Sequence, residues 1–250
     1  MNIVWRNDIR LEGDDFRKID AHSHIQELDY PFNVSITPEE FIDLMDAYRI
    51  EKAIISDIDN EKILDVVKEH EDKFIGIYWV NPRSRASVEE MKKFLEKHEF
   101  RGIKLHPLLH MYSPTDPRVY EVMKIAEDFS VHVQIHSGHP PTSLPWQIGE
   151  LAKKFPEVRV VMVHMGHGNA FYIQAAIEVA NGLENIFLET SGMPMPAKIR
   201  QAYEVAPKRV VFGIDLPCHH PVVEIAKVLT SGLDKDAIER VFYKNAKVLL

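Results

Sequence analysis

The segment RGIKLHPLLHMYSPTDPRVYEVMKIAEDFSVHVQIHSG (residues 101–138) contains one complete strand–helix–strand unit. Its two ends, Arg101–Pro107 and Val131–Gly138, are short, largely apolar runs, which is typical of parallel strands that are covered on both faces. Between them, Pro117–Phe129 has the apolar spacing of a helix and a proline in its first turn. The segment therefore predicts a βαβ unit.

The same alternation continues in both directions along the chain. Six further runs are predicted to be strands: Arg17–Ile25, Lys52–Ile58, Phe74–Val80, Val158–Gly166, Asn185–Gly192 and Arg209–Pro217. Further helices are predicted at 38–48 (after an N-cap at Thr37), Asn60–His70, Ser87–Lys97, Trp146–Phe155, Ala170–Ala180, Ala197–Val205, Pro221–Leu229 and Asp234–Leu249. Eight strands alternating with helices predict an α/β fold, a (β/α)₈ TIM barrel forming one domain over residues 1–250, with a C-terminal helix. An open doubly wound sheet is the alternative, but no phosphate-binding glycine pattern follows the first strand.

Composition and charge argue against several functional classes. The net charge of −8 is spread along the chain, whereas a nucleic-acid partner requires a basic face. The single cysteine, Cys218, rules out an intrachain disulfide and fits a reducing compartment. The first residues carry acids and lack the apolar core of a secretory signal, and no apolar stretch reaches the roughly 18 residues of a membrane span. We therefore expect a soluble, cytoplasmic protein with neither a nucleic-acid nor a membrane partner.

The histidines are concentrated at one end of the predicted strands. Of the 13 histidines in the chain, ten lie in the last residues of a predicted strand or shortly after it: His22, His24, His106, His110, His136, His139, His164, His167, His219 and His220. In a barrel these positions form the active-site face. Core packing gives no reason for this bias, but a metal site does.

Strand periodicity sharpens the prediction of a metal site. His22 and His24 are two residues apart on one strand, so they point to the same face. The fifth and sixth strands each contain a histidine at the end of an apolar run, His136 and His164, and the eighth leads into Asp215. Each feature alone has an ordinary explanation, such as a core histidine or a turn-forming aspartate. Together they favour a site for a divalent ion such as Zn²⁺, for which imidazole and carboxylate are usual ligands.

At these residues the sequence resembles the amidohydrolase superfamily. It is most similar to the amidohydrolase-related branch that contains aminocarboxymuconate-semialdehyde decarboxylase, aromatic-acid decarboxylases and pyrone-dicarboxylate lactonase. The matching motifs follow the family order over nearly the whole chain: IDAHSHI (19–25), GIKLHP (102–107), VQIHSG (133–138), VMVHMG (161–166), LETSG (188–192), FGIDLP (212–217) and NAKVLL (245–250).

The resemblance implies site residues and a cofactor. It implies that His22, His24, His136 and Asp215 ligate one divalent metal ion, with Zn²⁺ preferred, and that Asp215 and His164 are catalytic. Lys104 lies on the strand that, in some binuclear relatives, carries a carbamylated lysine as a bridging ligand. The GIKLHP form of this motif favours a single ion. Glu189 or Asp20 is a candidate for accepting a hydrogen bond from an imidazole, with a surface or structural role as the equal alternative. The loop residues His139, His167, His219 and Arg83 are candidates for contacting the substrate.

Our functional prediction is a metal-dependent hydrolase that uses a metal-activated water to cleave a C–N or C–O bond of a small-molecule substrate. The alternative on the same scaffold is a metal-dependent non-oxidative decarboxylase of an unsaturated or aromatic acid, for which Arg83 and Lys104 are the available cationic groups. A catalytically silent metal-binding barrel is a third reading, and it would have a closed coordination shell. A homodimer is expected from the family, and the sequence does not identify the substrate.

Overall fold

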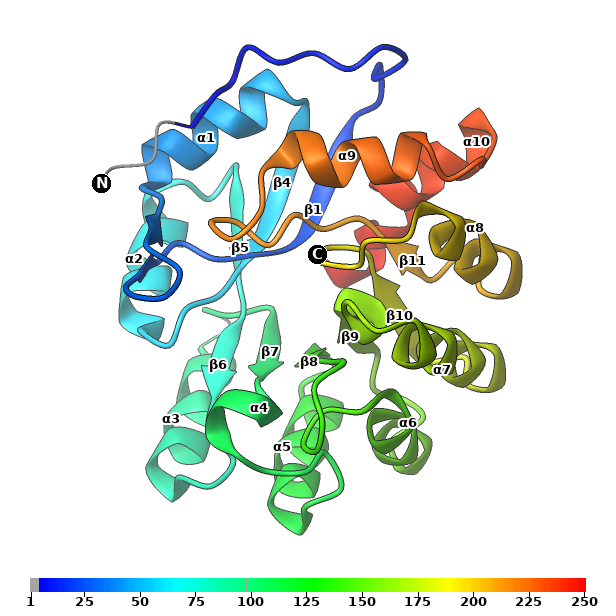
Figure 1. The fold of residues 1–250 in the computed structure, drawn as a ribbon. Helices are drawn as coiled ribbons and strands as arrows, with labels where there is room; N and C mark the ends of the chain where they lie inside the picture. The colour runs from blue at the N-terminus through cyan, green and yellow to red at the C-terminus, as the bar shows by residue number, and fades with distance from the viewer. Residues whose placement is uncertain (1–4, 98) are drawn as a thin grey trace.

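The computed structural model describes residues 5–97 and 99–250, and they form the predicted barrel. The chain runs once around a central set of parallel strands, and the helices form a ring outside them (Figure 1). The barrel strands are β1 (Lys18–Ser23), β4 (Ile50–Ile55), β5 (Phe74–Gly76), β6 (Tyr78–Val80), β7 (Gly102–Leu105), β8 (His132–His136), β9 (Val160–Val163), β10 (Ile186–Glu189) and β11 (Val210–Val211). Every predicted strand run therefore contains or overlaps a strand.

The strands form two hydrogen-bonded sheets that together close the barrel. One has the order β1-β4-β5 and the other β11-β10-β9-β8-β7-β6. The predicted third strand is interrupted at Ile77, where the pairing changes from β5 with β4 to β6 with β7. At the opposite seam the amide of Ala21 donates to the carbonyl of Phe212 and the amide of His24 to that of Leu216, both at 2.8 Å. The last strand is thus bonded to the first, which excludes the open doubly wound sheet.

The main helices begin close to their predicted start signals. They are α1 (Pro38–Ala47), α2 (Asn60–Glu69), α3 (Arg85–Glu96), α5 (Pro117–Asp128), α6 (Pro145–Lys154), α7 (Ala170–Gly182), α8 (Pro196–Val205) and α9 (Pro221–Leu229). At α1 the Thr37 hydroxyl accepts from the Glu40 amide at 3.2 Å, and the Glu40 carboxylate accepts from the Thr37 amide at 2.9 Å. This reciprocal cap satisfies two helix-end donors, and it explains why the helix starts where the sequence indicates.

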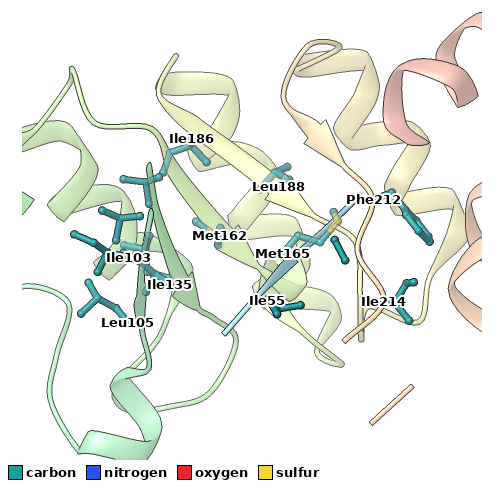
Figure 2. Packing of buried hydrophobic residues seen from close by; sticks show 14 of the residues in the cluster. Ile55, Ile103, Leu105, Ile135, Met162, Met165, Ile186, Leu188, Phe212 and Ile214 are labelled. Atoms are coloured by element: carbon teal, nitrogen blue, oxygen red, sulfur yellow. The ribbon is translucent and has the colours of Figure 1, made fainter. Parts of the chain in front are cut away.

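Alternate residues of the strands enter two separate apolar layers. The larger layer joins one face of the strands to the helices, and Figure 2 shows part of it: Ile103, Leu105, Ile135, Met162, Ile186 and Leu188. The smaller layer contains strand residues of the other parity, such as Val161, Phe187 and Val211, together with Tyr243, Ala246 and Leu249 of the C-terminal segment. Because this second layer contains no residue of the surrounding helices, it is the barrel interior, and the C-terminal segment covers its amino end.

Three features differ from the sequence-based prediction. The loop after β1 contains an antiparallel hairpin, β2 (Glu27–Leu28) with β3 (Val34–Ser35), and a short helix α4 (Pro107–His110) follows β7. The predicted C-terminal helix is divided into α10 (Lys235–Glu239), a π-helical turn η2 (Arg240–Lys244) and a 3₁₀ segment η3 (Asn245–Leu249). The Asn245 side-chain amide donates to the carbonyls of Pro207 and Val210, so this segment follows the barrel floor rather than a regular helical path.

No helix within the described residues has both the length and the apolar character needed to cross a bilayer.

Candidate metal centre

Two histidines and one aspartate meet at the carboxyl end of the barrel. His22 lies in β1, His24 follows it directly, and Asp215 follows β11. The Nε2 atoms of His22 and His24 each lie 3.5 Å from Oδ1 of Asp215, and one ligand atom from each residue lies within 4.8 Å of the other two. The alternation of β1 places both imidazoles together, and barrel closure brings the aspartate beside them.

Several backbone positions at this end of the barrel lie in the left-handed region. Asp215 has a φ of 66°, His164 of 65° and His167 of 57°. Such conformations cost a non-glycine residue about 1–3 kcal/mol each, so neighbouring contacts must hold them. At Asp215 the backbone amide donates to the carbonyl of His22 at 2.8 Å, and the preceding amide of Ile214 donates to the Asp20 carboxylate at 2.9 Å.

Backbone carbonyls fix the tautomers of two imidazoles. The Nδ1 atom of His24 lies 2.8 Å from the carbonyl of Ser56, and that of His164 lies 3.0 Å from the carbonyl of Ser191. A carbonyl only accepts, so Nδ1 carries the proton in each ring and Nε2 presents a lone pair. Burial lowers the pKa of His24 to about 3 and also lowers that of His164, so both rings are neutral, as metal ligation requires.

The buried carboxylates Asp20 and Glu189 hold the backbone rather than an imidazole. Asp20 accepts from the amides of His22 (3.1 Å) and Ile214 and from the hydroxyl of Ser23. Glu189 accepts from the amide of His164 at 3.0 Å and from the amide and hydroxyl of Ser191. Within the described residues neither carboxylate accepts a hydrogen bond from an imidazole, and Oε2 of Glu189 lies 3.9 Å from Nδ1 of His164. Both carboxylates therefore have the structural role that the sequence left open as the alternative.

Gly213 is required by the position of the Glu189 carboxylate. A β-carbon at residue 213 would lie 2.2 Å from Oε1 of Glu189, which is far inside van der Waals contact. The glycine therefore makes the space in which this carboxylate can reach the loop that carries His164.

Lys104 places a cationic group inside the cluster. Its side chain is fully buried, its Nζ lies 3.4 Å from Nε2 of His22, and the same Nζ lies 5.7 Å from the centre of the Trp79 ring. Burial lowers the pKa of Lys104, and the nearby Asp215 and Glu189 oppose that shift. Burial likewise raises the pKa of Asp215, which His219 and Lys104 oppose. Lys104 therefore favours the ionised form of Asp215, and Asp215 favours the protonated form of Lys104.

The fourth predicted ligand, His136, lies at the edge of the cluster. Its ring centre is 5.0 Å from that of His164, but its Nε2 lies 2.9 Å from Nδ1 of His139. Its ring also stacks on His106 at 4.0 Å, and His106 in turn stacks on Trp79 at 5.4 Å. The structure therefore brings His22, His24 and Asp215 together and places His136 beside them with its Nε2 directed to another histidine. Its role as a ligand stays a prediction.

The other candidate residues divide between the barrel mouth and the supporting loops. His139 and His167 lie side by side, with ring centres 4.5 Å apart. His219 contacts the buried carboxylate of Glu224 through Nδ1 at 2.8 Å, and this hydrogen bond raises its pKa. Arg83 is exposed and donates to the carbonyls that end α4, so it supports that loop.

Two of the ten histidines predicted near strand ends are helix caps. His106 accepts from the Leu109 amide at the start of α4, and His220 accepts from the Val222 amide at the start of α9. Sequence reasoning did not identify Gln134, which lies in the barrel interior with its Oε1 3.0 Å from Nδ1 of His22. The sequence feature that could have identified it is a polar residue between Val133 and Ile135, in the middle of an apolar strand.

The donor set fits a divalent cation. Two neutral imidazole nitrogens and a carboxylate oxygen face one another, and these are ligands that Zn²⁺ and similar ions use. A third imidazole, that of His164, lies close by, with its ring centre 5.5 Å from that of His22.

Comparisons with known proteins agree with this architecture. A family model described as amidohydrolase matches residues 19–250. No curated protein matches the sequence.

Three solved structures illustrate the likeness in fold. A probable 2-pyrone-4,6-dicarboxylic acid hydrolase from Acinetobacter baumannii with bound citric acid and a 5-carboxyvanillate decarboxylase from Sphingomonas paucimobilis each superpose with a TM-score of 0.72 at 16% identity, over 94% of this chain and 99% of theirs. A dihydroxybenzoic acid decarboxylase from Polaromonas with bound manganese and the inhibitor 2-nitroresorcinol has a TM-score of 0.71 at 14% identity, over 94% of this chain and 96% of its own. At these identities the likeness establishes the TIM-barrel fold.

Proposed function

The chain belongs to the amidohydrolase family, and on that basis we propose that it catalyses the metal-dependent, non-oxidative decarboxylation of an unsaturated or aromatic acid. Two of the three structures compared above are decarboxylases of aromatic acids, which supports this reading over hydrolysis. The observation that carries the proposal is the buried ammonium group of Lys104 beside the metal-binding cluster.

The cofactor we propose is one divalent cation held by His22, His24 and Asp215, with His136 as the further predicted ligand. Manganese is bound in the Polaromonas decarboxylase, and imidazole and carboxylate ligands suit both Mn²⁺ and Zn²⁺. When bound, the ion supplies a Lewis acid that holds and polarises oxygen atoms of the substrate.

Lys104 is suited to bind the carboxylate that leaves. A lysine carries three N–H donors, and within the described residues its Nζ has one hydrogen-bond contact, the long one to Nε2 of His22. A buried cation that lacks partners is costly, so an anionic ligand would gain a charge-assisted hydrogen bond and relieve that cost. A substrate carboxylate answers this requirement, whereas a neutral amide or ester does not.

Asp215 and His164 are suited to move the proton. In the metal-free protein burial raises the pKa of Asp215, so its carboxyl group exchanges a proton closer to neutral pH than an exposed aspartate does. In the proposed step the bond between the substrate carbon and its carboxylate breaks, CO₂ leaves, and the electron pair stays on carbon. That carbon takes the proton of Asp215, and the deprotonated carboxylate recovers a proton from water. His164, whose Nδ1 is held by the Ser191 carbonyl and whose ring lies beside that of His22, orients the acid–base group.

Hydrolysis of an ester, lactone or amide is the second candidate. It is supported by the similarity to the probable pyrone-dicarboxylic acid hydrolase, and the same Asp215 and His164 could transfer protons in that reaction. Lys104 would then bind a carboxylate that the substrate keeps rather than one that it loses.

One set of assays separates the two candidates. The protein loaded with Mn²⁺ or Zn²⁺ is incubated with hydroxylated aromatic acids and unsaturated acids, and CO₂ release is measured alongside loss of substrate absorbance. Lactones, esters and amides are tested in parallel by product analysis. CO₂ release that stops with a chelator supports the proposal. Chelator-sensitive cleavage of lactones or esters without CO₂ would establish the second candidate instead.

A further inference from the structure

Gln134 is a fully buried amide at the same level of the barrel as Lys104. The two are register partners on the adjacent strands β8 and β7, so both side chains point into the interior. The side chain of Gln134 makes two contacts there. Its Oε1 lies 3.0 Å from Nδ1 of His22, and its Nε2 donates to the carbonyl of Ala21 at 2.7 Å. Both contacts connect β8 across the barrel to β1, the strand that carries the two histidines of the cluster.

The contact with Ala21 fixes which way the amide faces. A backbone carbonyl only accepts, so the atom beside Ala21 must be the amide nitrogen, and the atom beside His22 must be the amide oxygen. An amide oxygen also only accepts, so Nδ1 of His22 must carry the proton. In a neutral imidazole this leaves Nε2 with a lone pair.

A second contact gives the same tautomer from the other side of the ring. The Nζ of Lys104 lies 3.4 Å from Nε2 of His22, and in its protonated form this group can only donate. Nε2 must therefore accept, as it must to bind a cation. Two neighbours on different strands thus agree on where the single imidazole proton lies.

His22 differs from the other two oriented imidazoles in the kind of group that fixes it. His24 and His164 donate to backbone carbonyls, which no substitution removes. His22 donates to a side chain. We propose that Gln134 is the positioning residue of the cluster: it holds His22 as the Nδ1–H tautomer and thereby sets the affinity of the cluster for a divalent cation. The affinity part rests on the proposed function, because it assumes that the cluster binds a cation, but the tautomer part does not.

The test compares two substitutions at one position. Gln134→Leu removes the acceptor, so the proton of His22 is free to move to Nε2 and block the lone pair. Gln134→Glu keeps an acceptor for Nδ1–H, loses the donor to Ala21 and, when ionised, adds a negative charge beside Lys104. For Mn²⁺ and Zn²⁺, measured by titration against a competing chelator, we expect binding to weaken about 10- to 100-fold in Gln134→Leu. In Gln134→Glu we expect affinity within about threefold of the unsubstituted protein.

A matched control separates positioning from general damage to the fold. Asn245 is also a buried amide, but it donates only to the carbonyls of Pro207 and Val210 at the opposite end of the barrel. Asn245→Leu should lower the melting temperature and leave cation affinity unchanged. Equal loss of affinity in Asn245→Leu and Gln134→Leu would overturn the proposal.

The tautomer is measured directly in metal-free protein. Long-range ¹H–¹⁵N NMR spectra should give His22 a protonated Nδ1 and an unprotonated Nε2, and Gln134→Leu should change that pattern. An unchanged pattern, or unchanged cation affinity in Gln134→Leu, would overturn the proposal. If Gln134→Leu does not fold, Gln134→Glu decides: retained affinity and tautomer support the proposal, and a protonated Nε2 there contradicts it.

The two proposals fail in different ways. A protein that binds no divalent cation removes the proposed function, and the NMR comparison still decides whether Gln134 sets the tautomer. A protein that binds cations but releases no CO₂ removes only the decarboxylation reading.

Discussion

Lys18 and Lys104 are both fully buried in the barrel, and their surroundings are opposite. At the amino end of β1, the ammonium group of Lys18 donates to the carbonyls of Phe16 (2.9 Å) and Tyr48 (3.0 Å) and contacts the Asp14 carboxylate at 2.6 Å. In the described structure, the ammonium group of Lys104 has one hydrogen-bond contact, an imidazole nitrogen at 3.4 Å. A buried charge whose donors are all used stabilises the fold, whereas one with unused donors is available to a ligand.

Other polar groups at the two ends follow the same division. Toward the amino end, NH1 of Arg209 donates to the carbonyls of Ala180, Leu183 and Ile186, all between 2.8 and 2.9 Å. At the carboxyl end, Nε2 of His24 lies 3.5 Å from Oδ1 of Asp215, and the ring of His164 lies close to that of His22. The barrel thus uses polar groups for structure at one end and leaves them available for chemistry at the other.

The largest expected effect comes from replacing Lys104, the buried lysine that has fewer hydrogen-bond partners. Lys104→Met should lower kcat/KM by about 10³-fold, equivalent to about 4 kcal/mol, because the substrate carboxylate loses its charge-assisted hydrogen bonds. Cation affinity should be retained or increased, since a positive charge has left the cluster. Steady-state kinetics and metal titration on the same preparation check both parts. Full activity in Lys104→Met would remove the basis of the proposed function.

The matched substitution at the other end should have the reverse outcome. Lys18→Met leaves two carbonyls and the Asp14 carboxylate without their partner, and breaking a buried ion pair in this way costs about 3 kcal/mol of unfolding free energy. Denaturant unfolding measures that loss, and kcat/KM of the folded protein should stay within a few-fold. A stable but inactive Lys18→Met protein would contradict the division between the two ends.

Glu189 sharpens the comparison, because it is a fully bonded charge at the functional end. It accepts from two amides and one hydroxyl, so it should act through the loop that carries His164 rather than on the substrate. Glu189→Gln replaces an acceptor by a donor and should cost about 2 kcal/mol of stability. Cation affinity should change little, whereas kcat should fall more than KM rises. An unchanged stability would argue that these three bonds are not formed.

The smallest expected effect is on the pH dependence of the unfolding free energy, through His132 at the amino end of the barrel. Burial lowers the pKa of His132 to about 4, whereas the unfolded chain takes up this proton below about pH 6.5. Between these values the unfolded state binds more protons, so this contribution to stability falls as pH falls. Replacing the ring by His132→Leu should therefore flatten the decline in unfolding free energy between pH 6.5 and 5 by about 1 kcal/mol. Parallel pH profiles for the two proteins would contradict the assignment.

Most of the barrel could be predicted from local sequence. The strand runs are apolar and short, and caps such as Thr37 with Glu40 place the helix starts. The interruption at Ile77 could not be predicted, because the change of pairing partner there depends on sheets that only the closed barrel brings together. The path of the C-terminal segment likewise depends on contacts between Asn245 and β11, which are distant in sequence.

The candidate site could be predicted less completely. His22 and His24 follow from strand periodicity, but the direction of a side chain beyond a strand end depends on loop dihedrals, as at His136 and at Asp215 with its φ of 66°. For the same reason, the ten histidines near strand ends include both residues that face the cluster and helix caps such as His106 and His220. The sequence favoured hydrolysis over decarboxylation. The buried position of Lys104 beside His22 supports the opposite order.

The most direct test of the central claim is anomalous diffraction from crystals grown with Mn²⁺ or Zn²⁺. The account predicts a single anomalous peak between β1 and the loop after β11, about 2.0–2.2 Å from Nε2 of His22, Nε2 of His24 and an oxygen of Asp215. No peak at that position, or an ion bound elsewhere while these three side chains remain without one, would contradict it.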